Sequence, residues 1–130
     1  MSILVVDCET TGLPSDPNAR VVEIGAVVLH PHRDYAEINW ITALVCPPGF
    51  RAVLGTRLPR NNILVDDVLA ADTEVFVREQ FAAFCADHQV TEVFSYNRSF
   101  DEGMLRRSGF DLPWAGCVLR LARSAMPKRS

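Results

Sequence analysis

The sequence predicts a mixed α/β domain in which three antiparallel strands are followed by a helix and a parallel strand. Three runs rich in β-branched residues lie within residues 1–46 and are joined by turns, as in hairpins. A segment with helical periodicity then separates them from a fourth strand-like run, which is typical of a crossover between parallel strands. The 130 residues are 48% hydrophobic and 22% charged, which fits one globular domain over residues 1–130.

The first three strands are predicted at residues 3–7, 21–29 and 37–45. Their sequences are ILVVD, VVEIGAVVL and EINWITALV. The stretch TTGLPSDPN supplies turn residues after the first strand, and a Pro-Pro-Gly sequence ends the third. Residues 47–70 are therefore expected to form a loop with one short helical turn.

Two helices are predicted around a fourth strand at residues 91–96. The first helix spans about 72–88, with Asp72 as its N-cap and an apolar face at i, i+4, i+7 and i+8. The second begins with an S-x-x-E capping box at Ser99 and Glu102 and ends before Gly109. A further helix is expected within 117–126. The expected buried residues of the two helices are Val77, Phe81, Phe84, Cys85, Phe100, Met104 and Leu105.

Composition excludes several classes of protein. No apolar run approaches the ~20 residues of a membrane span, and the N-terminus has no basic region before its apolar run, so we expect a cytoplasmic protein without membrane contact. The four cysteines are scattered, which favours reduced thiols over disulfides or a zinc site. Residues 98–130 hold seven of the 13 Lys and Arg residues and only three acids, which is compatible with a polyanionic ligand there.

Asp7 and Glu9 form a first candidate site at the end of the first apolar run. Alternation along a strand places both carboxylates on one side, where each raises the pKa of the other unless a cation neutralises them. Hard cations such as Mg²⁺ or Mn²⁺ match these oxygen ligands. The alternative is a solvated strand end. The sequence Thr10-Thr11-Gly12 favours a ligand site, because its hydroxyls and its glycine permit close approach of a ligand.

A second candidate site lies in SYNRSFDEGML, residues 95–105. Asn97 is expected at the end of the fourth strand and Asp101 in the first turn of the next helix, near the strand ends where sites assemble in crossover folds. Asp101 can be a partner of the helix dipole. The cap does not require it, which leaves it available as a ligand.

Together, VVDCETTGL and YNRSFDEGML resemble the DEDD (DnaQ-like) 3′–5′ exonuclease superfamily. This group includes the proofreading subunit of DNA polymerase III, ribonuclease T and oligoribonuclease. The resemblance extends from residue 3 to about 126 and implies a ribonuclease H-like fold. It also implies that Asp7, Glu9 and Asp101 are catalytic residues that hold two divalent metals, Mg²⁺ or Mn²⁺. The implied substrate-binding residues, around the 3′ end of single-stranded DNA or RNA, are Thr10, Thr11, Gly12, Leu13, Asn97 and Phe100.

The chemistry that the resemblance implies is phosphodiester hydrolysis. Two metals about 4 Å apart can activate a water, orient the scissile phosphate and stabilise the leaving 3′ oxygen. Such a site meets the backbone rather than base edges, so little sequence preference is expected.

The third motif of the superfamily, an Asp preceded by a His or Tyr, has no counterpart after Asp101. The remaining acids are Glu102 and Asp111, and Asp111 falls in a variable connection, where it is a poor substitute. Glu23 matches a recurring position, but a supporting or solvated acid is the favoured interpretation. We therefore expect a C-terminally truncated domain that is weak or inactive alone, because general-base catalysis contributes ~10²–10⁴-fold.

Three explanations stay open at this point. The chain is a fragment of a longer enzyme, a short form completed by another chain, or a non-catalytic nucleic-acid-binding or protein-interaction module of the same fold. An unrelated α/β domain with structural acids must explain both motifs by chance. A missing helix would leave apolar surface beside the first strand, so we also expect a homodimer or another chain to cover that surface.

Overall fold

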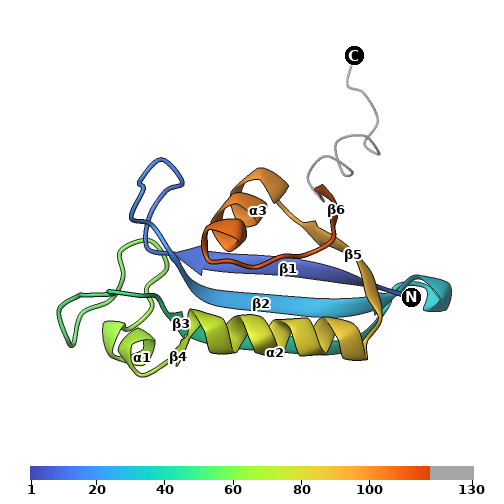
Figure 1. The fold of residues 1–130 in the computed structure, drawn as a ribbon, viewed down its shortest axis with the longest axis horizontal. Coiled ribbons are helices and arrows are strands. Elements are labelled where there is room, and N and C mark those ends of the chain that lie inside the picture. The colour runs from blue at the N-terminus through green and yellow to red at the C-terminus, as the bar shows by residue number, and fades with distance from the viewer. Residues whose placement is uncertain (118–130) are drawn as a thin grey trace, which may run out of the picture.

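The computed structural model describes residues 1–117 and contains one six-stranded sheet of order β4-β3-β2-β1-β5-β6 (Figure 1). β1 pairs antiparallel with β2, and β2 with β3, whereas β1 pairs parallel with β5. This confirms the predicted three antiparallel strands followed by a parallel crossover strand. The strands are β1 Ser2–Thr10, β2 Val21–His30, β3 Ala36–Cys46, β4 Asp72–Thr73, β5 Val90–Ser95 and β6 Trp114–Cys117.

The helices are α1 Val65–Leu69, α2 Glu74–Asp87 and α3 Arg98–Arg107, with a short 3₁₀ turn, η1, at Pro31–Arg33. The two longer helices share one core with the sheet. On β1 the alternate residues Leu4 and Val6 are buried, and they belong to the same cluster as Phe81 of α2 and Met104 of α3. Within the described residues, no helix is long and apolar enough to span a bilayer.

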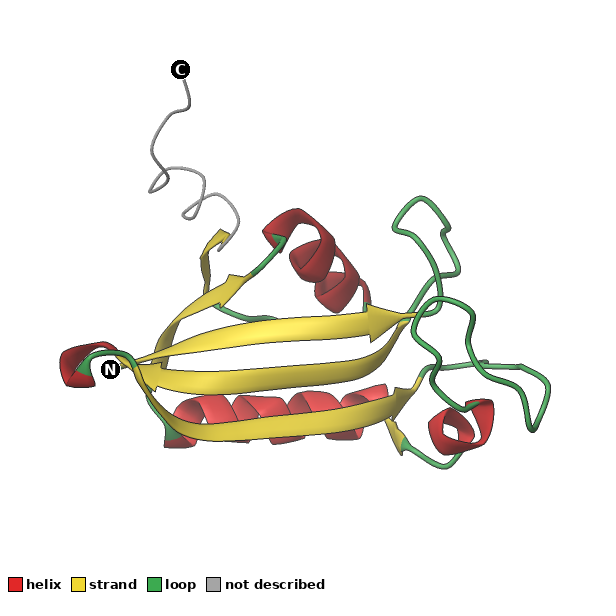
Figure 2. Ribbon diagram, turned by 180° about the vertical axis from the view of Figure 1, so that it is seen from behind, coloured by secondary structure: helices red, strands yellow, loops and turns green. Residues whose placement is uncertain are grey.

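The opposite side of the sheet, here called the open face, is not covered by any described helix. Figure 2 looks onto this face, with α2 behind the strands. It has a hollow of about 530 Å³ whose lining includes Val5, Asp7, Val27, Trp40 and Tyr96. The Trp40 side chain is 62% exposed. The expected apolar surface beside the first strand is thus present, and the homodimer stays a prediction.

Both predicted helix starts were displaced. The N-cap of α2 is Thr73, whose Oγ1 accepts a hydrogen bond from Phe76 N at 3.2 Å, because Asp72 is already paired with β3 in β4. The predicted capping box at Ser99 is wrong, since α3 begins at Arg98 and its N-cap is Asn97. The Glu102 carboxylate instead forms ion pairs on the helix surface.

β1 is longer than expected, and β4 and β6 were not predicted. β1 continues to Thr10, because its residues up to that position pair with β2, so the acid pair lies within the strand. β6 forms because the turn after α3 returns the chain to the free edge of β5, where Val93 pairs with Trp114. The expected helix at 117–126 lies outside the described residues, apart from Cys117 at the end of β6.

Candidate functional site

The acids of the first motif lie on the open face near the end of β1. Asp7 is exposed and Glu9 is half-buried, while Cys8 between them points into the core. In the register of β1 and β2, Glu9 lies directly opposite Glu23. Like charges that face each other across strands destabilise a sheet. The sequence favoured Glu23 as a supporting or solvated acid, and the structure makes it the cross-strand neighbour of Glu9.

Asp101 approaches β1 from α3, on the side to which the Cys8 side chain points. Its Oδ1 accepts hydrogen bonds from Cys8 N at 3.3 Å and from Cys8 Sγ at 3.1 Å. The Cys8 amide is available because the pairing of β1 with β5 ends at Val6. Only 3% of Asp101 is exposed. The structure therefore brings Asp101 onto the residue between Asp7 and Glu9, 93 positions away in sequence.

Two carboxyl groups at this site, those of Glu9 and Asp101, have raised pKa values. Burial raises the pKa of Glu9, and the charges of Asp7 and Glu23 raise it further. Burial likewise raises the pKa of Asp101, with a contribution from Asp7, while the hydrogen bonds from Cys8 oppose the shift. Burial also raises the pKa of the Cys8 thiol, so it stays protonated and remains a donor. A bound cation would offset this repulsion among the carboxylates.

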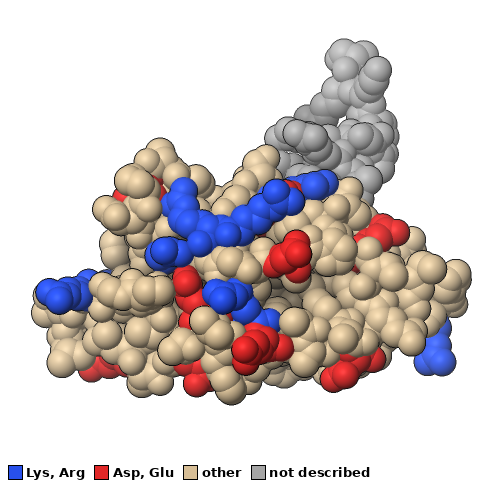
Figure 3. All heavy atoms as spheres, viewed as in Figure 1, with Lys and Arg blue, Asp and Glu red and all other residues tan. Residues whose placement is uncertain are grey.

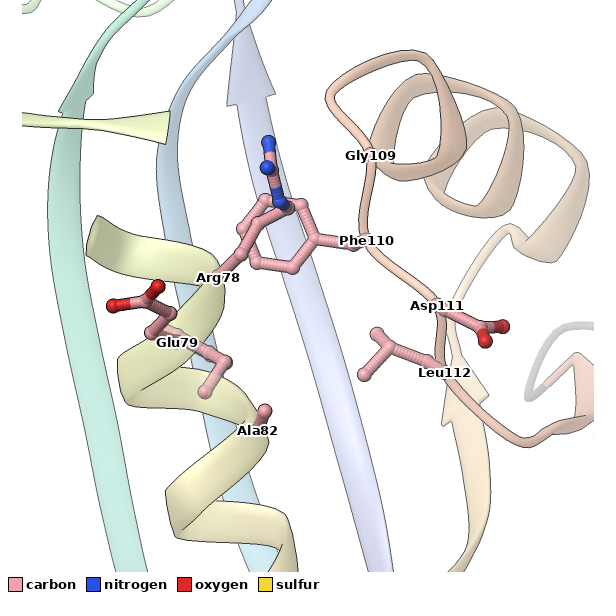
Figure 4. Close-up of a pocket in the computed structure, with 8 residues that line it drawn as sticks. Arg78, Glu79, Ala82, Gly109, Phe110, Asp111 and Leu112 are labelled. Atoms are coloured by element: carbon pink, nitrogen blue, oxygen red, sulfur yellow. The ribbon is translucent and has the colours of Figure 1, made fainter. Parts of the chain in front are cut away.

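The oxygen-rich donor set suits a hard divalent cation. Across residues 1–117, however, no three Asp, Glu, His or Cys side chains converge closely enough to enclose a metal ion. The carboxylates are thus of the kind that Mg²⁺ or Mn²⁺ prefers, but those described here form only part of a metal site. Asp111 does not complete it. It is exposed and lines a separate pocket of about 250 Å³ beside α2, with its carboxylate directed away from that helix (Figure 4).

The residues after β1, here called the motif loop (residues 11–20), form a tightly bonded turn. Thr10 Oγ1 donates to Gly12 O at 2.8 Å, and Thr11 Oγ1 accepts from Arg20 N at 3.0 Å. A Cβ on Gly12 would lie 3.3 Å from the Asp16 carboxylate, so a larger residue would crowd the loop. Leu13 is 52% exposed and therefore free to contact a ligand.

A reciprocal clasp joins the motif loop to the end of α3. The Arg107 guanidinium donates to the carbonyl oxygens of Pro14, Asp16 and Ala19 at 2.8–3.1 Å. In return, Arg20 Nη1 donates to Arg107 O at 2.8 Å. Since α3 also carries Asp101, this clasp fixes the motif loop relative to the third acid. Sequence reasoning treated Arg107 only as part of a basic region.

The other residues expected at the substrate lie near the start of α3. Asn97 is exposed, and its side chain forms no capping hydrogen bond. Phe100 is half-buried and packs against the main core, so it supports α3. Their contacts with a nucleotide stay a prediction.

A second loop also reaches the end of β1. The arginine loop, defined as residues 47–64, is bound there because Asn61 Nδ2 donates to Thr10 O at 2.9 Å. Its neighbour Arg60 lies close enough to Glu9 to lower the pKa of that carboxyl, against the other charges. In Figures 1 and 2 the two loops lie at the same end of the sheet. Apart from the arginines of the segment, nothing in the sequence predicts this contact.

The fold of this chain is similar to the folds of several solved nucleases. No protein-family model matches the sequence, and no curated protein does. Among solved structures, E. coli Exonuclease I in complex with a 5cy-dA13 oligonucleotide matches 95% of this chain with 15% identity and a TM-score of 0.67. The nuclease domain of 3′hExo, a DEDDh family member bound to rAMP, matches 85% with 18% identity and a TM-score of 0.61. Cell-death related nuclease 4 (CRN-4) matches 99% with 17% identity and a TM-score of 0.65.

The matched part of each larger chain is limited. This chain spans 29% of the Exonuclease I chain, 60% of the 3′hExo chain and 50% of the CRN-4 chain. E. coli Exonuclease I has also been solved in a zinc-bound form with single-stranded DNA. Fold likeness at these identities, together with the observed sheet order, identifies the architecture. The chain therefore has the ribonuclease H-like fold of the DEDD-family 3′-exonucleases.

Proposed function

We propose that this chain is the core of a divalent-metal-dependent 3′–5′ exonuclease domain that removes nucleotides from the 3′ end of single-stranded DNA or RNA. One observation carries the proposal. Asp101 is hydrogen-bonded to Cys8, the residue between Asp7 and Glu9, so the acid of the second motif lies beside the strand that carries the acids of the first. A purely structural role for Asp101 would not explain why Asp7, Glu9 and Glu23 crowd the adjoining surface.

In this proposal Asp7, Glu9 and Asp101 hold Mg²⁺ or Mn²⁺. The bound ions would supply Lewis-acid stabilisation of the phosphate and a nucleophilic water. The chain's own residues then position the substrate. The exposed Leu13 is available to contact the terminal nucleoside, and the motif loop keeps its backbone shape through its internal hydrogen bonds. Cys8 holds Asp101 in place through its amide and thiol.

The expected activity of these 130 residues alone is weak, because the third motif is missing from the sequence. The proposal is therefore tested by metal binding as well as by cleavage. Isothermal titration with Mn²⁺ should give measurable binding for the wild type and at least a tenfold loss for Asp7→Asn or Asp101→Asn. The matched control is Asp87→Asn, because Asp87 is an exposed acid at the end of α2.

Cleavage is measured with a 5′-labelled single-stranded oligonucleotide and Mn²⁺. Any trimming should proceed from the 3′ end and be lost in Asp7→Asn but kept in Asp87→Asn. Equal Mn²⁺ affinity in all four proteins would contradict the proposal. Robust trimming would instead contradict the expected weakness and indicate that another residue supplies the last ligand.

A second candidate function is a non-catalytic nucleic-acid-binding module of the same fold. It is favoured by the absence, within residues 1–117, of a convergent group of three metal-ligating side chains. Binding of single-stranded DNA that is unaffected by chelation of divalent ions, together with no trimming, would support this function over the first.

A further inference from the structure

The arginine loop contains two arginines that do not stabilise the described fold through hydrogen bonds or ion pairs. Arg51 and Arg60 are both exposed, and among the described residues neither guanidinium takes part in a hydrogen bond or an ion pair. Arg57, the third arginine of this loop, differs because its Nη1 donates to Asn62 O at 2.9 Å. Arg51 and Arg60 are therefore available to a ligand.

The loop that carries them is held in place. Leu58 is 8% exposed and packs in a second core cluster with Val22, Val65 and Val68. Backbone hydrogen bonds join Leu58 to both Ile63 and Asn62, and Asn61 is bound to the carbonyl of Thr10. Arg60 thus precedes the residue that contacts the end of β1. Its position beside Glu9 is set by the fold rather than by a flexible side chain alone.

Arg51 lies at a second position along the same loop. It lines a groove of about 520 Å³ between the motif loop and the start of the arginine loop. One wall contains Thr11, Asn18 and Arg20, and the other contains Pro47, Phe50 and Arg51. Asp16 also lines the groove, but its Oδ1 accepts a hydrogen bond from Asn18 N, and Arg20 is already engaged with Glu74 at 3.6 Å. Of the two arginines that line this groove, Arg51 is the one without a hydrogen bond or ion pair to the described residues.

Arg60 thus lies beside the acids at one side of the motif loop, and Arg51 lies at the groove beside the same loop. A single strand whose 3′ end occupies Thr10–Leu13 must continue away from the acids, and its phosphates require cations along that path. We propose that the arginine loop is a phosphate-binding wall for single-stranded nucleic acid, with Arg60 meeting the phosphate next to the acids and Arg51 meeting one further from the 3′ end. This inference rests on the proposed function and extends it to the strand behind the terminal nucleotide.

The test uses fluorescence anisotropy of the full chain with a 5′-fluorescein octathymidylate in Mg²⁺. A phosphorothioate at the last linkage slows trimming. Arg60→Ala and Arg51→Ala should each weaken binding about three- to tenfold and reduce the salt slope by about 0.7, the value for one phosphate contact on a single strand. The matched control is Arg33→Ala, since Arg33 lies in η1 between β2 and β3, at the other end of the sheet.

A mononucleotide separates the two positions. Thymidine monophosphate, competed against the labelled strand, should lose affinity in Arg60→Ala and keep it in Arg51→Ala. Binding of the octathymidylate by both variants as tightly as by Arg33→Ala would overturn this inference while leaving the proposed function intact. A wild-type chain that binds neither probe would contradict the proposed function itself, and this inference with it.

Discussion

The arginines of α3 and two of the three arginines of the arginine loop differ in how they are bonded within the fold. On α3, Arg98 Nε and Arg106 Nη2 both lie close to the Glu102 carboxylate, at 2.6 and 2.9 Å, and Arg107 is bound to three carbonyl oxygens. In the arginine loop, Arg51 and Arg60 have no such partners among the described residues. The three described arginines of the basic C-terminal segment are thus already paired within the fold, whereas Arg51 and Arg60 are not paired to any described residue.

The surface illustrates the same difference. Figure 3 shows basic side chains gathered across the region of α3 and a smaller group at the left end, over the arginine loop. The basic composition of residues 98–130 is compatible with a polyanionic ligand, which stays a prediction. Among the described residues of that region, the hydrogen-bonding groups of Arg98, Arg106 and Arg107 instead stabilise α3 and the motif loop.

The largest expected effect is the loss of the clasp in Arg107→Ala. Removing the three hydrogen bonds should lower the free energy of unfolding by about 2 kcal/mol, because the carbonyl oxygens lose a charged donor and regain only water. Chemical denaturation measures this loss, and hydrogen exchange of the motif loop should become faster. The control is Arg106→Ala, an exposed partner of Glu102, for which a change under about 0.5 kcal/mol is expected. Equal stability of the two variants would remove the distinction drawn between them.

An intermediate effect is expected for Glu102→Gln, which releases Arg98 and Arg106 from their ion pairs. The stability cost should be within about 1 kcal/mol, since both pairs are on the helix surface. Binding of a single-stranded oligonucleotide should strengthen at low salt, because two cations become available. Anisotropy at low and high salt measures the change, with Glu79→Gln on α2 as the control. Unchanged binding would show that these arginines lie outside the path of the strand.

The smallest expected effect concerns pH and Arg60. The pKa of Glu9 is raised in the folded state, so the folded state binds this proton more tightly than the unfolded chain does. The free energy of unfolding therefore falls as the pH rises from the pKa of Glu9 in the unfolded chain to its higher pKa in the folded state. Affinity for Mn²⁺ should rise over the same range, since the ligand must be deprotonated. In Arg60→Ala the pKa of Glu9 should move further upward, as followed by ¹³C NMR of its carboxyl. Arg51→Ala should leave it in place, and an equal shift in both would contradict the assigned position of Arg60.

The four longer strands, β1, β2, β3 and β5, and the two longer helices could be predicted from the sequence because their periodicity is local. The register that puts Glu23 opposite Glu9, and the return of Trp114 to the edge of β5, could not, since both depend on pairing between distant segments. Asp101 was identified from its motif. Its hydrogen bonds to Cys8 required the three-dimensional structure, because the sequence marks Cys8 only as a small apolar residue.

The contact between Asp101 and Cys8 also has a consequence for the order of folding. It closes a loop of 93 positions, and the parallel pairing of β1 with β5 closes one almost as long. Such non-local contacts form slowly, because the chain entropy is lost before the contacts compensate for it. The hairpins β1–β2 and β2–β3 join neighbouring segments and can form early. We expect the group of acids to be completed late in folding and to be among the first features lost on partial unfolding, so that the proposed chemistry requires the fully assembled domain.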